Sequence, residues 1–412
     1  MEKSGCFSRG MGFSSFAIAF FASVPTLNMI ITKIVPSTEG MMMVSLYVIS
    51  YLLILLSFLY YTPRTKPSSW FLFVLASIFV AFILTQNPSI PSLLKLPNFF
   101  VFTIIPFLIP QLVQVDARRV VFLLMIIPAF GVLFITRVFS LSDFATIEMD
   151  LTYSFLTPIA AALVCIFIYY KDSNVKHKVI LVVFLAINMI FFLFCLLFGS
   201  RAASLSIVLC AVFLACTKID PRKTGFKIKP LFWIVLVLLI LLVLFFKDIL
   251  YMAASLFKAY NIESYQLEKM ITLYEMGDLS DGRSAINELA LNGIADSPIY
   301  GYGMSASKPI TDYDYPHNFV LQLLLDGGVL LFTAVMLPML SNLLRLKRKG
   351  TNDEYVLITT LFFASVPGAL FSMDLWENQR FWLFMGFLLS NLFKKTSFRK
   401  YALIKNKEDL SR

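Results

Sequence analysis

Charged residues are scarce in this sequence. Asp, Glu, Lys and Arg make up 15% of the 412 residues, whereas hydrophobic residues make up 58%, and the mean hydropathy is +0.79. A soluble domain of this size needs more polar surface than these residues provide. The composition therefore excludes an ordinary soluble protein and predicts that lipid surrounds most of the chain.

Cysteine and histidine are also few, with five and two residues. Cys6 lies near the N-terminus and the other four cysteines lie inside apolar runs, so no disulfide framework is indicated. No pair of cysteines has the spacing of metal ligands, and we expect neither a bound metal nor a cofactor. Internal repeats and low-complexity linkers are absent as well.

Long apolar runs occupy most of the chain instead. A helix needs roughly 20 residues to cross ~30 Å of hydrocarbon. The first run lacks a convincing signal-peptide cleavage site, so we interpret it as an uncleaved helix. The runs that meet or nearly meet this length are 12–34, 41–61, 69–85, 99–115, 119–139, 151–170, 178–198, 202–217, 231–250, 318–341, 355–372 and 379–393.

These runs predict an all-α polytopic membrane protein with about 12 transmembrane helices and one large, partly helical outer loop. Residues 1–250 would hold the first nine spans, residues 251–316 the outer loop, and residues 317–412 the last three spans and a cytoplasmic tail. Most Lys and Arg residues fall on one side of the membrane in this arrangement, which predicts that both termini are cytoplasmic. This distribution explains the net charge of +10 better than nucleic-acid binding does.

The predicted outer loop carries signs of ordered structure. It holds nine acidic and four basic residues, as suits a translocated segment. Asp281 is placed to cap a helix over about 283–295, which Ser297-Pro298 would end before a turn at Gly301-Tyr302-Gly303. The apolar face of this helix would consist of Ile286, Leu289, Ala290 and Ile294. A structured loop of this length is more than a connection.

Two arginines and a histidine mark the predicted outer side. Arg201 follows an apolar run, where it is either an interfacial anchor or a cation for a lipid-linked phosphate. Arg283 is either a surface residue or part of an anion site with the N–H groups of the loop helix. His317 precedes a long apolar helix and is either structural or a proton acceptor near neutral pH. His177, among lysines, is expected to be solvated.

Other polar and aromatic residues on this side have weaker signals. Asp312-Tyr313-Asp314 matches the short metal-binding motif of soluble nucleotide-sugar transferases, but three residues match by accident often. Tyr302 and its neighbouring tyrosines could stack on sugars, although aromatic residues are expected at a membrane surface. Arg380, in the last outer loop, is either a third cation or an anchor of the final helix.

The order of these motifs resembles that of the bacterial O-antigen ligase and polymerase superfamily of membrane glycosyltransferases. The resemblance covers about 199–330, and the N-terminal half adds hydropathy but no motif. One departure is Asp326, an acid before the glycine pair where the family commonly has a less acidic residue. The residues that carry it are Ser200-Arg201, Gly282-Arg283, Ser297-Pro298 through Gly303, and His317-Asn318 followed by Leu321, Gln322, Leu325 and Gly327-Gly328.

The resemblance implies transfer of a glycan from an undecaprenyl-diphosphate carrier, without a metal, on the outer face of the bacterial cytoplasmic (inner) membrane. It implies that Arg201 and Arg283 bind the donor diphosphate and that His317 orients or deprotonates the acceptor hydroxyl. Direct displacement would invert the anomeric centre. Arg380, Tyr302 and Asn318 are further candidate substrate-binding residues. The expected partners are the lipid-linked glycan donor, a glycan acceptor and the bilayer, and a chain-length regulator is a further candidate.

The leading interpretation is a polymerase that joins lipid-linked repeat units into O-antigen, capsule or a similar polysaccharide. The alternative is a ligase that transfers the finished glycan to lipid A–core or another acceptor. A flippase for the same glycans belongs to another class, and the absence of repeated halves speaks against it. A purely structural membrane protein would have no reason to gather two arginines and a histidine on one side.

Overall fold

The computed structural model is almost entirely helical, as predicted. It describes residues 2–35, 39–61, 67–83, 96–127, 129, 149–170, 173–198, 200–218, 227–228, 233, 237, 244–260, 265–277, 282–349 and 351–390. The described strands are β1 (Thr217–Lys218) and β2 (Lys227–Ile228), a short antiparallel pair. The helices of the bundle are α1 (Glu2–Ile34), α2 (Glu39–Tyr61), α3 (Ser69–Ile83), α5 (Leu96–Phe99), the π-helix η2 (Phe100–Ile104), α6 (Ile105–Leu112), α7 (Ala117–Ile126), α10 (Met149–Tyr169), α11 (Val175–Phe198), α12 (Arg201–Cys216), α18 (Phe319–Lys349), α19 (Asn352–Phe371) and α20 (Gln379–Leu389).

Six described helices are long and apolar enough to cross a membrane, which makes the chain a multi-pass membrane protein. These are α1, α2, α10, α11, α18 and α19, and shorter apolar helices cover the predicted spans 69–85, 99–115 and 202–217. Most of the predicted span 231–250 and the second half of 119–139 lie outside the described residues. The prediction of 12 spans, the division at residues 250 and 317 and the cytoplasmic location of the termini therefore stay predictions.

Helix α20 shows why apolar length alone does not define a span. It has 11 residues, and every one of them is buried, so protein rather than lipid surrounds it. A Cβ atom on Gly386 would lie 2.6 Å from the carbonyl oxygen of Phe107, and Gln111 Nε2 donates to the Gly386 oxygen over 2.8 Å. The backbones of α20 and α6 can thus approach closely, as small residues allow between membrane helices.

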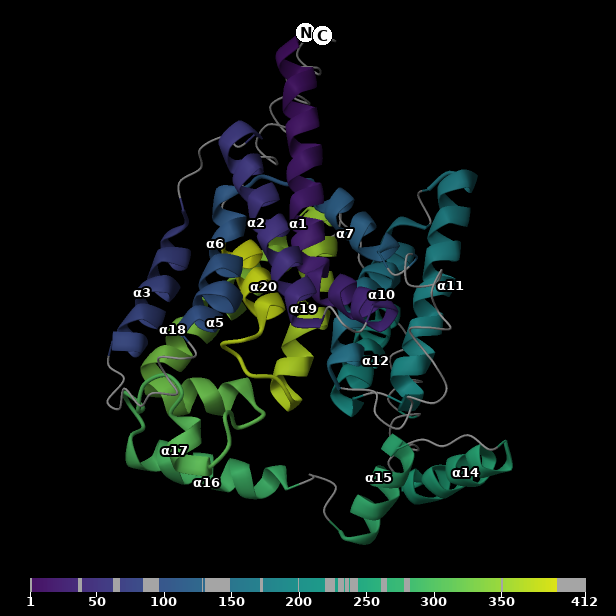
Figure 1. Cartoon of the computed structure of the whole chain (residues 1–412), viewed down its shortest axis with the longest axis vertical. Helices are drawn as coiled ribbons and strands as arrows, with labels where there is room; N and C mark the ends of the chain where they lie inside the picture. Colours follow the sequence, from purple (N-terminus) through teal and green to yellow (C-terminus); the bar gives the residue numbers. More distant parts are fainter. Residues whose placement is uncertain are drawn as a thin grey trace.

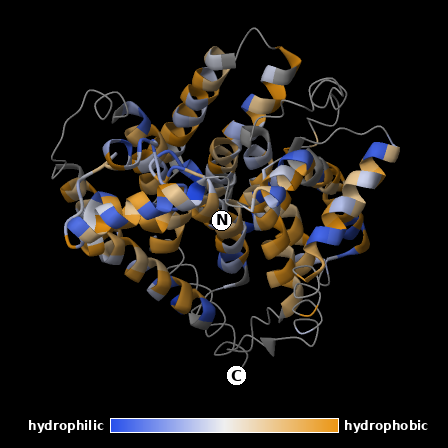
Figure 2. Ribbon diagram, turned by 90° about the horizontal axis from the view of Figure 1, so that it is seen from below, coloured by the Kyte–Doolittle hydropathy of each residue, from blue (hydrophilic) through white to orange (hydrophobic). Residues whose placement is uncertain are grey.

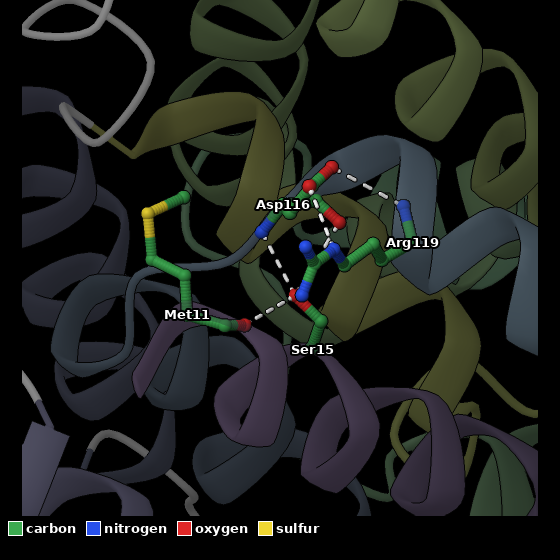
Figure 3. Close-up of polar contacts among 4 residues, drawn as sticks. All are labelled: Met11, Ser15, Asp116 and Arg119. Atoms are coloured by element: carbon green, nitrogen blue, oxygen red, sulfur yellow. Dashed lines mark hydrogen bonds and ion pairs between the residues drawn. The ribbon is translucent and has the colours of Figure 1, made fainter. Parts of the chain in front are cut away.

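The connection between α6 and α7 is fastened to the N-terminal half of α1 (Figure 3). The Ser15 hydroxyl donates to the Met11 carbonyl oxygen over 2.7 Å and accepts from the Asp116 N–H over 2.9 Å. Asp116 caps α7 by accepting from the Arg119 N–H, and it also pairs with the Arg119 side chain at 3.2 Å. These contacts fix one end of the bundle.

Four shorter helices lie at the other end of the molecule, away from the N-terminal end of α1 (Figure 1). Figure 2 looks onto this end and shows hydrophilic residues on its short helices, with mostly hydrophobic residues on the spanning helices. The segment 251–316, predicted as the outer loop, contributes most of them. They are α14 (Phe246–Ala259), α15 (Tyr265–Glu275), α16 (Arg283–Asp296) and α17 (Ser307–Thr311).

Helix α16 confirms the predicted loop helix with two differences. It begins at Arg283 and ends at Asp296, but its N-cap is Gly282 in a left-handed conformation, with no side-chain cap. The proposed cap, Asp281, lies outside the described residues. Ile286 and Ala290 are buried as expected, whereas 45% of Leu289 is exposed. The inner face of α16 instead includes Gly293, next to Ile310 and Leu325, because close contact with α17 and α18 favours a residue without a side chain.

Helix α18 is broken at Gly328, where φ is +62° and ψ is −163°. The turn that follows α16 fills the break. The N–H groups of Tyr302 and Gly303 donate to the carbonyl oxygens of Leu325 and Asp326, over 2.9 and 2.7 Å. Beyond the break, the Val329 N–H donates to the Pro298 oxygen over 2.8 Å. The turn therefore satisfies backbone groups that a broken membrane helix would otherwise leave unbonded.

Candidate functional site

Each of the three predicted arginines lies in the first turn of a helix. Arg201 is the first residue of α12, Arg283 the first of α16, and Arg380 the second of α20. The N-terminus of a helix carries a partial positive charge, so a cation there is disfavoured unless an anion is also present. Three such positions lie at the end of the bundle near α16, hereafter the site end.

Tyr153, near the start of α10, lies close to Arg283 and Arg380 and bonds to Ser200, the residue before Arg201. The Ser200 hydroxyl, directly before Arg201, donates to the Tyr153 hydroxyl over 3.0 Å. The Ser200 N–H donates to the Thr152 hydroxyl over 3.1 Å. Tyr153 also interacts with the Ser372 side chain and lies within electrostatic reach of Arg283 and Arg380.

The C-terminal end of α19 brings Arg283 and His317 toward the same place. Arg283 Nη1 donates to the Phe371 carbonyl oxygen over 2.6 Å, and the Tyr315 hydroxyl donates to the next carbonyl oxygen, that of Ser372, over 3.2 Å. The Tyr315 and His317 rings are 4.4 Å apart between centroids, in an edge-to-face arrangement. Residues from α16, from the segment before α18 and from α19 thus meet at two consecutive backbone carbonyls.

Arg380 is held deep in the bundle, with only 6% of the residue exposed. The start of α20 is fixed by Asn378, which accepts from the Phe381 N–H, and by Gln379, which bonds to the Tyr47 hydroxyl and the Phe21 carbonyl oxygen. Tyr47 and Tyr153 both lie within electrostatic reach of the Arg380 guanidinium. Burying a cation is costly, so its hydrogen bonds and the charges around it matter more here than at the surface.

Asp326 joins the broken helix to the loop between α19 and α20. Only 1% of it is exposed, and its carboxylate accepts from the Trp376 indole N–H over 2.6 Å and from the Ala306 N–H over 3.3 Å. One turn earlier, Gln322 donates to Asp374 over 2.7 Å and accepts from the Leu375 N–H. Asp326 is therefore a structural acceptor that fixes the loop leading to Arg380.

Two predicted substrate-binding residues also have local structural roles. The Asn318 side-chain oxygen accepts from the Val320 and Leu321 N–H groups, so Asn318 caps α18. The Tyr302 N–H donates to the Leu325 carbonyl oxygen at the break of α18. The side chain of Tyr302, between Gly301 and Gly303 in the sequence, is half-buried. Neither position excludes a ligand contact, and the substrate-binding roles of both stay predictions.

Asp312 and Asp314 are both exposed, and Lys308 Nζ donates to the Asp312 carbonyl oxygen rather than to its carboxylate. Within the described ranges, no group of three or more His, Cys, Asp or Glu side chains is arranged to hold a metal ion. Nothing in this arrangement favours the nucleotide-sugar motif.

Tyr153 and Ser372 are site residues that the sequence does not identify. Tyr153 lies near the start of one apolar run and Ser372 at the end of another. At such positions hydropathy indicates where a helix ends but not which residues bind a ligand. The run of polar residues Thr152, Tyr153 and Ser154 at the start of a span was the available signal. Its location at the same end as Arg201 follows only once helix directions are known.

A family model described as O-antigen ligase matches residues 186–336. The match contains Arg201, Arg283, Tyr302, His317 and Asn318, together with the broken part of α18, whereas Tyr153 and Arg380 lie outside it. No curated protein and no solved structure matches the chain.

Proposed function

We propose that this chain, which its residues 186–336 place in the O-antigen ligase and polymerase superfamily, joins undecaprenyl-diphosphate-linked oligosaccharide repeat units. The reaction would take place on the outer face of the bacterial cytoplasmic membrane and produce O-antigen, capsule or a similar polysaccharide. The bilayer would deliver the donor, and a second lipid-linked glycan would supply the acceptor hydroxyl.

The positive helix ends are the observation that carries this proposal. Arg201, Arg283 and Arg380 add three guanidinium charges to three helix N-termini. Guanidinium groups and helix N-termini each attract anions, so this arrangement favours a bound anion. A diphosphate supplies several acceptor oxygens, and each guanidinium can engage two of them with fixed geometry.

The proposed reaction is a direct displacement. The acceptor hydroxyl oxygen forms a bond to the anomeric carbon while the bond from that carbon to the diphosphate oxygen breaks. The departing diphosphate takes the electron pair, and His317 accepts the hydroxyl proton. The arginines offset the growing charge on the leaving group, which is often the largest contribution to catalysis. Attack from the opposite side inverts the anomeric centre.

The surroundings of His317 support its role as the oriented base. Its backbone is in the left-handed region, with φ at +52°, a conformation that costs free energy in a residue other than glycine. The edge-to-face contact with Tyr315, which is bonded to Ser372, limits the orientation of the imidazole ring. A fixed ring is what proton transfer from a positioned hydroxyl requires.

Ligation is the second candidate because the matching family is described as O-antigen ligase. Deletion of the gene separates the candidates through the surface and lipid-linked glycans that accumulate. Glycans that carry a single repeat unit indicate a lost polymerase, and lipid-linked polymer that is not transferred indicates a lost ligase. Single lipid-linked units on the inner face of the membrane would indicate a flippase and contradict both.

Substitution of the proposed site residues tests the assignment in the deletion strain. Arg201→Ala, Arg283→Ala and His317→Ala should each reduce transfer by about 100-fold or more, with normal amounts of protein in the membrane. Arg119→Ala and His177→Ala are matched controls. Arg119 also lies in the first turn of a helix, but at the other end of the bundle, and His177 is exposed beside Asn174. Full activity in all three site variants would contradict the assignment.

A further inference from the structure

We propose that Tyr153, together with Ser200 and Ser372, forms a hydroxyl subsite for the diphosphate of the donor, a proposal that rests on the proposed function. The three residues come from α10, from the turn before α12 and from the end of α19. Their hydroxyl groups are neutral hydrogen-bond donors that lie among the charged arginines.

The hydrogen bond from Ser200 to the Tyr153 hydroxyl leaves the tyrosine proton for another acceptor. Ser200 Oγ donates to the Tyr153 oxygen over 3.0 Å, so the phenolic proton points elsewhere. The Ser372 side chain is the other group that interacts with this hydroxyl. A serine hydroxyl can both donate and accept, so it can turn when a stronger acceptor arrives. A phosphate oxygen is such an acceptor, because hydrogen bonds to charged groups are shorter and stronger than those between neutral groups.

The electrostatic surroundings of Tyr153 indicate which ligand its hydroxyl would meet. Arg283 and Arg380 both act on this side chain, and Arg201 follows its partner Ser200 directly. Only 6% of Tyr153 is exposed, so the hydroxyl works in a region with little competing water. An anion attracted by the arginines would therefore lie within reach of the phenolic O–H group.

Packing and hydrogen bonding fix the position of the Tyr153 side chain. It packs against α19 at Gly368, where an added Cβ atom would lie 3.3 Å from the ring carbon Cε1. The helix backbone thus defines one wall for the ring, and the bond from Ser200 defines the direction of the oxygen. A donor that is already positioned loses little entropy when the ligand binds.

Tyr153→Phe tests the subsite, because the substitution removes the hydroxyl and keeps the ring. The probe is geranylgeranyl diphosphate in detergent, which carries a lipid-linked diphosphate but no sugar. We expect Tyr153→Phe to weaken its binding to the purified full-length protein about tenfold, the effect of one hydrogen bond to a charged group. Ser372→Ala should weaken binding in the same direction by a smaller factor.

Tyr169→Phe is the matched control. Tyr169 lies at the opposite end of the same helix, and its hydroxyl donates to Asp353 over 2.8 Å. This variant also loses a tyrosine hydrogen bond, and it should bind the probe as the wild-type protein does. Equal weakening in Tyr169→Phe would mean that loss of a helix contact explains the effect, and this would overturn the subsite.

The arginine variants separate failure of the subsite from failure of the proposed function. If Arg283→Ala loses the probe while Tyr153→Phe binds it normally, the subsite is wrong and the diphosphate site stands. If Arg201→Ala and Arg283→Ala also bind normally, the proposed diphosphate site is itself wrong. If Tyr153→Phe does not fold, normal binding by Ser372→Ala would overturn the subsite, and weakened binding would support it.

Discussion

At the scale of single residues, the positions that hold the site together are those where one side chain bonds to two different segments. Asp326 accepts from Trp376, in the loop before α20, and from Ala306, in the turn before α17. Trp376 in turn stacks on Trp382, with ring centroids 5.5 Å apart. A change at Asp326 should therefore affect both the segment directly before α17 and the loop that leads to Arg380.

Asp326→Asn should lower the free energy of unfolding by about 1–3 kcal/mol. An amide has one acceptor oxygen, so its NH2 group would face either the Trp376 indole N–H or the Ala306 N–H. Thermal unfolding in detergent measures the change, and Asp314→Asn is the control because Asp314 is exposed. Equal stability of the two variants would show that the carboxylate does not hold these segments together.

The residues of the site were predictable to different degrees. Arg283 was identifiable because turn residues and apolar spacing, both local features, indicate the helix that it begins. Arg380 was identifiable as a cation near a span, but its burial was not, because burial depends on α6, α18 and α19 packing around α20. Tyr153 was not predictable, since its partners Ser200 and Ser372 are 47 and 219 residues away in the sequence.

At the scale of elements, the break in α18 is the feature that joins the segment 297–303 to the bundle. Gly301 and Gly328 both have positive φ, and an added Cβ atom at either would lie within 2.6 Å of backbone atoms of the other segment. Sequence indicated a glycine turn and a glycine pair separately. It could not indicate that the two pack together, because the contact depends on the path of the chain between them.

Gly328→Ala should disrupt this junction. The added methyl group would lie 2.2 Å from the backbone of Ile299, at a residue whose φ of +62° already disfavours a side chain. We expect a loss of about 3 kcal/mol or more in stability, together with loss of transfer activity. Gly40→Ala is the matched control, because nothing lies within 4 Å of the added atom. Wild-type stability and activity of Gly328→Ala, measured by thermal unfolding and transfer, would contradict the described junction.

The predicted spans show the limit of hydropathy for helices. The long runs 151–170 and 355–372 correspond to α10 and α19, whose bounds differ from the prediction by a few residues. The run 99–115 is instead divided into α5, η2 and α6, with Pro106 and Pro110 within α6. An apolar run gives the same signal whether it faces lipid or, as in α20, neighbouring helices.

At the scale of the whole molecule, the site and the N-terminal end of α1 lie at opposite ends of the bundle (Figure 1). The excess of Lys and Arg in the other connections predicts that the site end faces outward. Donor glycans in the outer leaflet and the acceptor would then both reach the arginines from the outer side of the membrane.

Labelling of single cysteines tests this orientation. In a variant without the native cysteines, Asp314→Cys should react with a membrane-impermeant maleimide applied to intact spheroplasts. Val175→Cys, exposed at the start of α11 near the other end, should react only after the membrane is opened. The reverse pattern would place the site end in the cytoplasm and contradict the proposed outer-face reaction.

The central claim is that this protein transfers glycans from a lipid diphosphate with His317 as the base, and reconstitution tests it most directly. Purified protein in liposomes would receive a synthetic undecaprenyl-diphosphate-linked repeat unit, and the lipid-linked products would be separated by size. We predict that the wild-type protein yields a ladder of longer glycans with the inverted linkage and that His317→Ala yields almost none. A folded wild-type protein that leaves the donor unchanged, or a His317→Ala variant with full activity, would contradict the claim.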